Sequence, residues 1–472
     1  MRWRIVFLLG SGLAVWLLGG TAAAQPPDRP PSPLTLREAI QFGLDHFPSV
    51  QASLARVSAA QSGIDLARTA YLPRVDVGFQ ESRGTFNNVS GLYFSNSFTQ
   101  PISGADIGRR SYSSAWGSSG GIAAAWEPFD FGLRAANVEA ARAAEQQATA
   151  GVTLTRLEVG LGVGDAFLAV VAAQEAVRAR QANVERLGVF AKTVDVLVKN
   201  ELRPGVDASR ARAELALART QLIQAQQTEE IARATLAEVL GVAGERLVVQ
   251  AEPLLKIPPS SQPPELRLRA HPLAAAQETK VEVFRKRKEA LDLAWAPRFG
   301  LQAGYYGRGS GWDAQGNRNS DTDGLLPDSP NWAAGLTATF SLFDVASIRA
   351  QRRIEQHNEA AESARHEQVL QALTAGQAKA LATVESARLI TENTPVQLAA
   401  ARDTEGQARA RYQAGLTTVI EVAEAERLLV QASIDDALAR LGVWRSLLGL
   451  GGSRGDLGPF LDLLQASPTG GQ

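Results

Sequence analysis

Apolar residues recur at two different spacings along this chain, and each spacing predicts one kind of element. In four short stretches the apolar residues occupy every second position, as Val75, Val77 and Phe79 do, and the positions between them are polar or small. A period of two with one apolar face is typical of a strand. We therefore expect four strands, at about 75–82, 118–127, 299–306 and 333–341.

Elsewhere the apolar residues keep a helical spacing over unusually long stretches. The pattern predicts two very long helices, at about 132–199 and 346–413, each followed after a short turn by a returning helix, at about 206–240 and 417–448. A helix of such length spans about 100 Å, which is more than the width of a compact domain. Helices of this kind must lie against other long helices to be stable.

The two halves of the chain are copies of one unit. Asp130 and Asp344 occupy equivalent positions 214 residues apart, and the same offset relates Asp207 to Glu421. Asp130 therefore precedes Asp207 by 77 residues, and Asp344 precedes Glu421 by the same number. Two helical hairpins with arms of equal length should end at the same level. We predict repeat 1 over 25–252, repeat 2 over 253–452 and a loose C-terminal tail over 453–472.

The turn of the second hairpin carries clear helix stop and start signals. Gly415 follows one helical pattern, and Thr417 precedes the next, which has Glu421 in its first turns. Glycine just past a helix and threonine just before one are typical of helix ends. The first hairpin has Glu201 at the position equivalent to Gly415.

The N-terminus has the features of a secretory signal peptide. Arg2 and Arg4 precede an apolar run that ends at Leu18, and alanines at 22–24 form a small-residue cleavage site. We predict that residues 1–24 are removed, the alternative being a retained anchor helix. No later apolar run has the length of a membrane helix, but an exported chain can also cross a membrane as strands.

Composition and motifs exclude several functions. The net charge is −1 and no basic stripe is present, which argues against nucleic acid as a partner. The absence of cysteine excludes disulfides, thiolate metal sites and a lipid-modified N-terminal cysteine. The sequence contains no phosphate loop, nucleophile elbow or His-Glu metal motif, so we expect no enzyme activity, cofactor or metal site. Of the four scattered histidines, His46 and His271 precede prolines and are expected at helix junctions.

Four strands are too few to close a barrel, and open sheet edges are not tolerated in lipid. If the strands cross a membrane, they must be shared between chains: two chains would give eight strands and a filled interior, and three would give twelve and a lumen. The polar segments 82–117 and 307–331 would then be exposed loops. Aromatic residues cluster at the strand ends, as interfacial aromatics do, although the core of a soluble sheet would also hold them. They are Trp116, Trp126, Tyr305, Trp332 and Phe340.

A series of motifs, in the right order on the duplicated frame, resembles those of the TolC-like outer-membrane efflux proteins, and the resemblance covers nearly all of the mature sequence. The motifs are LTLREAIQFGLDHFP, YLPRVDV, WEPFDFG, PPELRLRAHPLAAA, WAPRFGL, FSLFD and RYQAGLTTVIEVAEAERLLVQA. The resemblance implies a mainly α fold with a small β part, in which a homotrimer forms a twelve-stranded barrel in outer-membrane lipid and a periplasmic tunnel of twelve helices.

The implied function is passive export in a tripartite efflux or type I secretion system. The implied partners are a periplasmic membrane-fusion adaptor and an inner-membrane pump. Drugs, metal ions, a secreted protein and a cell-surface precursor all remain possible substrates. The alternative is a soluble, exported coiled-coil scaffold, which would be extracted by salt rather than by detergent.

The resemblance also implies a gate at the hairpin tips. In the family, a tyrosine before the second turn, an arginine after it and a carboxylate after the first turn hold the tips together. Carried over by position, the tyrosine is Tyr412 and the carboxylate is Asp207, while Thr417 stands in the place of the arginine. Arg203 and Arg210 are the candidates to replace that arginine, and Arg210 could equally lie on a solvated face.

Further carboxylates on the returning helix can ring the lumen in the family. Here the candidates are Glu421 and Glu424, with a solvated helix surface as the alternative. If they ring the lumen, symmetry brings like charges together, which favours cations and resists closure.

Overall fold

The computed structural model describes residues 29–85, 112–259, 268–313, 315 and 317–466. The predicted signal peptide, 1–24, lies outside the described residues, as does most of the first predicted loop. Twelve helices and strands are described in addition to two short 3-10 helices, η1 (Glu252–Leu255) and η2 (Leu268–Ala270). In chain order they are α1 (Leu36–His46), α2 (Pro48–Thr69), β1 (Arg74–Thr85), β2 (Ser114–Phe129), α3 (Leu133–Lys199), α4 (Gly205–Val239), α5 (Pro272–Leu293), β3 (Arg298–Ser310), β4 (Ser329–Thr339), α6 (Asp344–Gln413), α7 (Val419–Arg454) and α8 (Gly458–Ala466).

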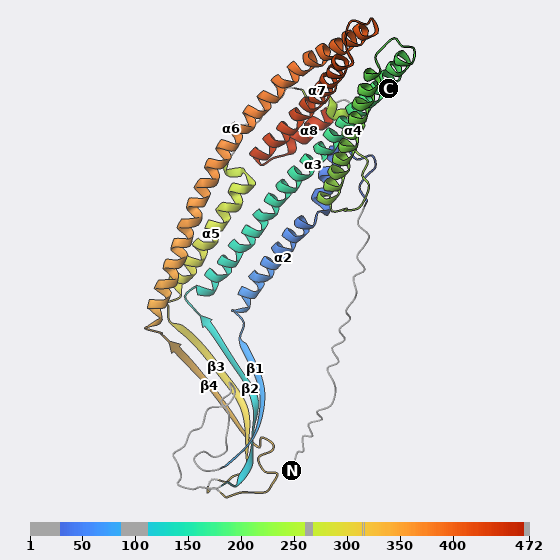
Figure 1. The fold of residues 1–472 in the computed structure, drawn as a ribbon. Coiled ribbons are helices and arrows are strands. Elements are labelled where there is room, and N and C mark those ends of the chain that lie inside the picture. The colour runs from blue at the N-terminus through green and yellow to red at the C-terminus, as the bar shows by residue number, and fades with distance from the viewer. Residues whose placement is uncertain (1–28, 86–111, 260–267, 314, 316, 467–472) are drawn as a thin grey trace.

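The molecule is a long, gently curved rod with the sheet at one end and two helical hairpin tips at the other (Figure 1). Four helices rise from the strands in the spatial order α2, α3, α5, α6, each packed against the next. Towards the tips, α4 folds back on α3 and α7 folds back on α6. The fold is therefore mainly helical and internally duplicated, and equivalent hairpins of the two repeats end together.

The sheet is antiparallel with the strand order β1-β2-β3-β4. Its register aligns Val77, Ile122, Tyr305 and Trp332 across the four strands, so that these side chains share one face. All four are more than half exposed, up to 78% for Trp332. The opposite face carries mostly glycine, alanine, serine and other polar residues. The sheet is thus amphipathic, with its apolar face turned away from the rest of the chain.

The main hydrophobic core lies midway along the rod, where α1, α3, α7 and α8 meet the segment around 247–254. Trp444 is fully buried in it and donates a hydrogen bond from Nε1 to the carbonyl oxygen of Lys256 at 3.0 Å. One 18-residue window of α3 is apolar enough to cross a membrane by length and composition, in contrast to our expectation from sequence, but 61% of it is buried inside the protein. Packing in this core accounts for its apolar character.

The predicted loose tail over 453–472 is wrong in its first part. Helix α7 continues to Arg454, and α8 follows it, with Phe460 only 3% exposed against Trp444. Gly452, in the last turns of α7, allows close packing rather than ending the helix. A Cβ added at Gly452 would lie 2.8 Å from Leu161. The strands also extend beyond their predicted ends, most clearly β2, which begins at Ser114.

Candidate functional site

The two hairpin turns have the same backbone geometry. In the first, the amide of Leu202 donates to the carbonyl of Leu197, and in the second, Leu416 donates to Arg411, as in a Schellman C-cap. This cap requires a left-handed residue, and Gly415 takes that conformation with φ 82°. Its equivalent, Glu201, adopts φ 59° although it carries a side chain. The difference in residue type therefore does not change the shape of the turn, but it strains the first tip.

Tyr412, in the last turn of α6, is the centre of a cluster that joins the two hairpins. Its side chain is 1% exposed and lies edge-on to Phe190 of α3, with the ring centroids 5.1 Å apart. The guanidinium carbon of Arg203, from the first turn, lies 4.5 Å from the Tyr412 ring centroid. Arg203 also donates a hydrogen bond from Nη2 to the carbonyl oxygen of Tyr412. One arginine thus contacts both the ring and the backbone of the opposite hairpin.

Asp207 of α4 completes this cluster. The Tyr412 hydroxyl donates to Asp207 Oδ2 at 3.4 Å, which is long for a hydrogen bond between oxygens. Burial raises the pKa of Tyr412, and the negative charge of Asp207 adds to the increase. The tyrosine therefore stays protonated, and able to donate, throughout the physiological pH range. We call Arg203, Asp207 and Tyr412 the tip cluster.

The structure separates the remaining predicted tip residues into buried and exposed positions. Thr417 is 7% exposed, and its hydroxyl has no hydrogen-bond partner among the described residues. Arg210 is exposed and makes no ion pair or hydrogen bond within the described chain. Glu421 is exposed without such a partner as well, whereas Glu424 lies 3.2 Å from Nη1 of Arg427. Of the two arginine candidates, only Arg203 contacts the tyrosine.

A buried charge network, which the sequence analysis missed, lies farther from the tip. Glu426 of α7 has a side chain only 1% exposed, and it accepts hydrogen bonds from Arg186 of α3 at 2.8 Å and Arg409 of α6 at 3.0 Å. Arg409 is also 3.1 Å from Glu405. Burial raises the pKa of Glu426, in opposition to the lowering effect of Arg186. The network ties one helix of repeat 1 to both arms of the second hairpin.

The first hairpin has the same ion pair with its charges exchanged. Positions 195 and 212 are equivalent to 409 and 426, and they hold Asp195 and Arg212, 3.9 Å apart and partly exposed. A second link between the hairpins is formed by Arg427 of α7, whose Nη2 lies 2.8 and 2.9 Å from the two carboxylate oxygens of Glu214 in α4. The exchange of charges at the repeat offset was visible in the sequence and is the signal that could have found these residues.

The described residues contain no group of three or more His, Cys, Asp and Glu side chains placed to hold a metal ion. His271 caps the N-terminus of α5: its Nδ1 accepts from the amide of Leu273 at 3.1 Å, and its Nε2 lies 3.1 Å from the carbonyl oxygen of Gly452. His46 is the last residue of α1. The chemistry available at the tips is therefore the making and breaking of polar contacts between helices.

Comparisons with known proteins agree with this architecture. The sequence profile of the family described as "Outer membrane efflux protein" matches residues 40–242 and 263–453. The chain is similar to protein CyaE of Bordetella pertussis, with 26% identity over 92% of this chain and 86% of CyaE. It is also similar to the pyoverdine export outer membrane protein OpmQ of Pseudomonas putida, with 24% identity over 88% and 84% of the two chains. Among solved structures, the outer membrane protein VceC of Vibrio cholerae matches with a TM-score of 0.70 and 18% identity over 89% of this chain and 96% of VceC.

Proposed function

The chain belongs to the outer membrane efflux protein family and is a subunit of an outer-membrane channel, and we propose that three copies form the export conduit of a tripartite efflux or type I secretion system. The observation that carries the proposal is the open, amphipathic sheet. Strands β1 and β4 each have only one neighbour among the described strands, so both leave an edge unpaired. Lipid does not tolerate such edges.

Pairing of β4 with β1 of the next chain would close the sheet, because the order of antiparallel strands makes these two edge strands run in opposite directions. Three chains supply twelve strands, which is enough to leave a lumen. The strands have 11 to 16 residues, while about 9–11 suffice to cross a bilayer. The exposed apolar face then contacts lipid, and the face with glycine, serine and polar residues lines the lumen. A soluble scaffold would leave this apolar face in water, which makes it the weaker candidate.

The tip cluster is proposed as the closed gate of the tunnel. Arg203 and Asp207 of the first hairpin hold Tyr412 of the second, so the two hairpins of one chain cannot separate until these contacts break. Glu421 has no partner within the described chain and is proposed to face the lumen as a ring of three carboxylates. The paired Glu424 contributes less to that ring.

The tunnel is passive in this proposal, so its partners supply energy and substrate. The hairpin tips, at the end of the rod opposite the sheet, would meet a periplasmic membrane-fusion adaptor and an inner-membrane pump (Figure 1). The tunnel would carry what that pump delivers. Identification of the adaptor that co-purifies with the intact channel would therefore narrow the range of substrates.

The decisive experiment is a mass measurement of the protein extracted in mild detergent. We expect a mass of three chains, each 50.3 kDa before removal of the signal peptide. A stable monomer that retains all four strands would refute the shared barrel. Extraction by high salt alone would support the scaffold instead. A tag inserted at residues 315–320, between β3 and β4, should be labelled on intact cells, because long barrel loops face the exterior.

A further inference from the structure

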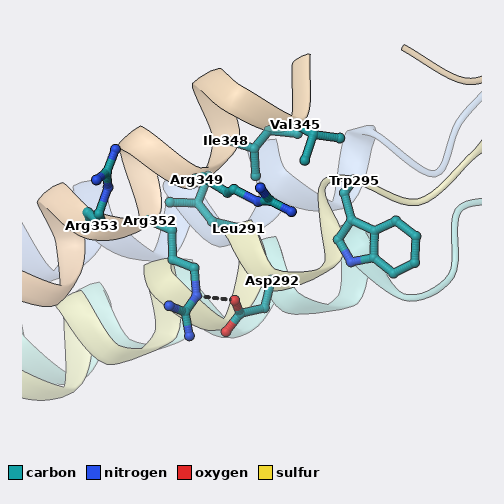
Figure 2. Close-up of a pocket in the computed structure, with 8 residues that line it drawn as sticks. All are labelled: Leu291, Asp292, Trp295, Val345, Ile348, Arg349, Arg352 and Arg353. Atoms are coloured by element: carbon teal, nitrogen blue, oxygen red, sulfur yellow. Dashed lines mark hydrogen bonds and ion pairs between the residues drawn. The ribbon is translucent and has the colours of Figure 1, made fainter. Parts of the chain in front are cut away.

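A groove between α5 and α6 lies where these helices meet the sheet (Figure 2). This open groove has a volume of about 870 Å³, within the size range of small-ligand sites. Three arginines line it, Arg349, Arg352 and Arg353, against one carboxylate, that of Asp292. The groove is therefore strongly positive for its size.

Within the described part of the chain, only one of the three guanidinium groups is neutralised. Arg352 donates from Nε to Asp292, as the dashed line in Figure 2 shows. Arg349 and Arg353 form no ion pair or hydrogen bond with any described residue. The Arg349 side chain extends toward the ring of Trp295 at the end of α5 (Figure 2). Two positive charges are thus left for a partner from outside the chain.

The equivalent groove in repeat 1, between α2 and α3, is filled and neutral. Arg134 stands there at the position of Ile348 and is only 8% exposed. It pairs with Asp130 at 2.9 Å, and its guanidinium carbon lies 5.1 Å from the ring centroid of Tyr71, the residue that corresponds to Trp295. The two repeats share a backbone, so the open, positive groove of repeat 2 is a property of its side chains rather than of the fold.

The position of the groove relative to the membrane boundary indicates which molecules can contact it. Trp295 lies just before β3, and Trp126 and Phe340 lie at the same end of the apolar sheet face. Aromatic residues in this position mark the boundary between hydrocarbon and headgroups. This boundary is the periplasmic one, because the helices continue beyond it. Phospholipid headgroups therefore lie at the height of the arginines.

A neighbouring chain does not supply the missing negative charge. In the proposed assembly, on which this step rests, α6 faces α2 of the next chain. Near its sheet end α2 carries one carboxylate, Asp65, and it already pairs with Arg68 at 3.1 Å. The charge must come from a third component, and the lipid headgroup is the anion that is present at this level.

From this geometry we infer that the α5–α6 groove is a binding site for the phosphodiester of an anionic phospholipid in the periplasmic leaflet. Arg349, which extends toward Trp295, binds the phosphate oxygens, since a guanidinium presents paired donors that match phosphate geometry. Arg353 points away from Arg349 (Figure 2) and attracts the headgroup by its positive charge. Trp295 packs against the glycerol and the first acyl carbons. The bound lipid ties α5 to α6 at the point where the barrel continues into the helical tunnel.

The test is a titration of the purified, delipidated full-length protein with short-chain phosphatidylglycerol or short-chain phosphatidylcholine, followed by calorimetry. We expect phosphatidylglycerol to bind more tightly than phosphatidylcholine. Arg349→Gln with Arg353→Gln should weaken phosphatidylglycerol binding about thirtyfold, since each basic residue near an anionic headgroup contributes roughly a fivefold factor. The control is Arg219→Gln with Arg402→Gln, which removes two exposed arginines far from the groove and should leave binding unchanged. Arg349→Lys with Arg353→Lys should retain most of the preference, because the charge remains.

Three results would overturn the inference. The first is equal binding of the two lipids by the unaltered protein, and the second is an equal loss in the control variant. The third is binding of inorganic phosphate as tight as that of phosphatidylglycerol, which would assign the groove to a soluble anion. The mass of the assembly is measured independently, so a failure here is distinguishable from a failure of the three-chain proposal.

Discussion

Replacement of Arg203 by glutamine should open the periplasmic end of the tunnel. The change removes the guanidinium that lies 4.5 Å from the Tyr412 ring and donates to the Tyr412 carbonyl. No other described residue makes both contacts between the hairpins. Glutamine is long enough to keep part of the hydrogen bond but has no charge to place over the ring.

The size of the effect follows from the burial of these contacts. A cation–π contact on a desolvated ring contributes about 1–2 kcal/mol, and a hydrogen bond from a charged donor about 1.5–3 kcal/mol. If glutamine retains some of the hydrogen bond, the net loss is about 2–3 kcal/mol for each chain. That loss shifts the equilibrium between joined and separated hairpins by roughly 30- to 150-fold.

The assay is single-channel conductance in planar bilayers, where we expect larger conductance and longer open periods for Arg203→Gln. Arg210→Gln is the matched control, because it removes the same charge from α4, where the Arg210 side chain forms no ion pair or hydrogen bond with any described residue. Arg203→Lys should lie between the two, since lysine keeps the charge but not the flat guanidinium. Equal conductance of Arg203→Gln and the unaltered channel, or equal opening by Arg210→Gln, would refute the proposal that Arg203 holds the tip cluster closed.

Four further predictions follow from the tips and the helix junction. Asp207→Ala should raise conductance less than Arg203→Gln, because the 3.4 Å bond that it removes is weak. Glu421→Gln should lower cation preference in single-channel recordings, while added Glu424→Gln changes it little, because Glu424 pairs with Arg427. Glu201→Gly should raise the melting temperature, since relief of a left-handed non-glycine residue stabilises by about 1 kcal/mol. Burial lowers the pKa of His271, so that as the pH decreases this imidazole takes up a proton in the unfolded state before it does so in the folded state. The free energy of unfolding should therefore fall as the pH decreases below 6.5. His271→Asn should remove this pH dependence while keeping a helix cap.

The last three of these predictions would be contradicted by the following outcomes. Unchanged ion selectivity in the Glu421→Gln, Glu424→Gln channel would place both glutamates on an ordinary solvated surface. A lower melting temperature for Glu201→Gly would mean that the glutamate side chain stabilises the turn in the assembly. An acid-induced loss of stability that persists in His271→Asn would assign it to other groups.

The helical hairpins were predictable because a long helix repeats its spacing of apolar residues over many turns. The spacing of apolar residues placed the end of α3 at Lys199 and of α6 at Gln413, and the offset of 214 related one hairpin to the other. The tail was not predictable in the same way. Glycine ends a helix in one context and permits close packing in another. The packing role of Gly452 depends on Leu161, which is distant in the sequence and adjacent only in the folded chain.

The tip cluster could be predicted only in part. Tyr412 and Asp207 followed from the family resemblance, but the position equivalent to the family arginine holds Thr417, and sequence alone left two arginines as substitutes. Glu426 could not be found from local pattern, since a glutamate among many charged residues on a long helix is usually solvated. Its burial depends on Arg186, 240 residues away.

The different residues at equivalent tip positions of the two repeats explain how one duplicated backbone can build junctions of unequal strength. Arg203 and Thr417 are equivalent positions, and so are Val198 and Tyr412. The pair that meets within a chain is Arg203 with Tyr412, which is polar and buried. If the second hairpin of one chain meets the first hairpin of the next in the same way, the pair at that junction is Thr417 with Val198, which offers no charged bond. Junctions within a chain and between chains would then alternate in strength around the tips, so the three junctions between chains should separate first when an adaptor opens the tunnel.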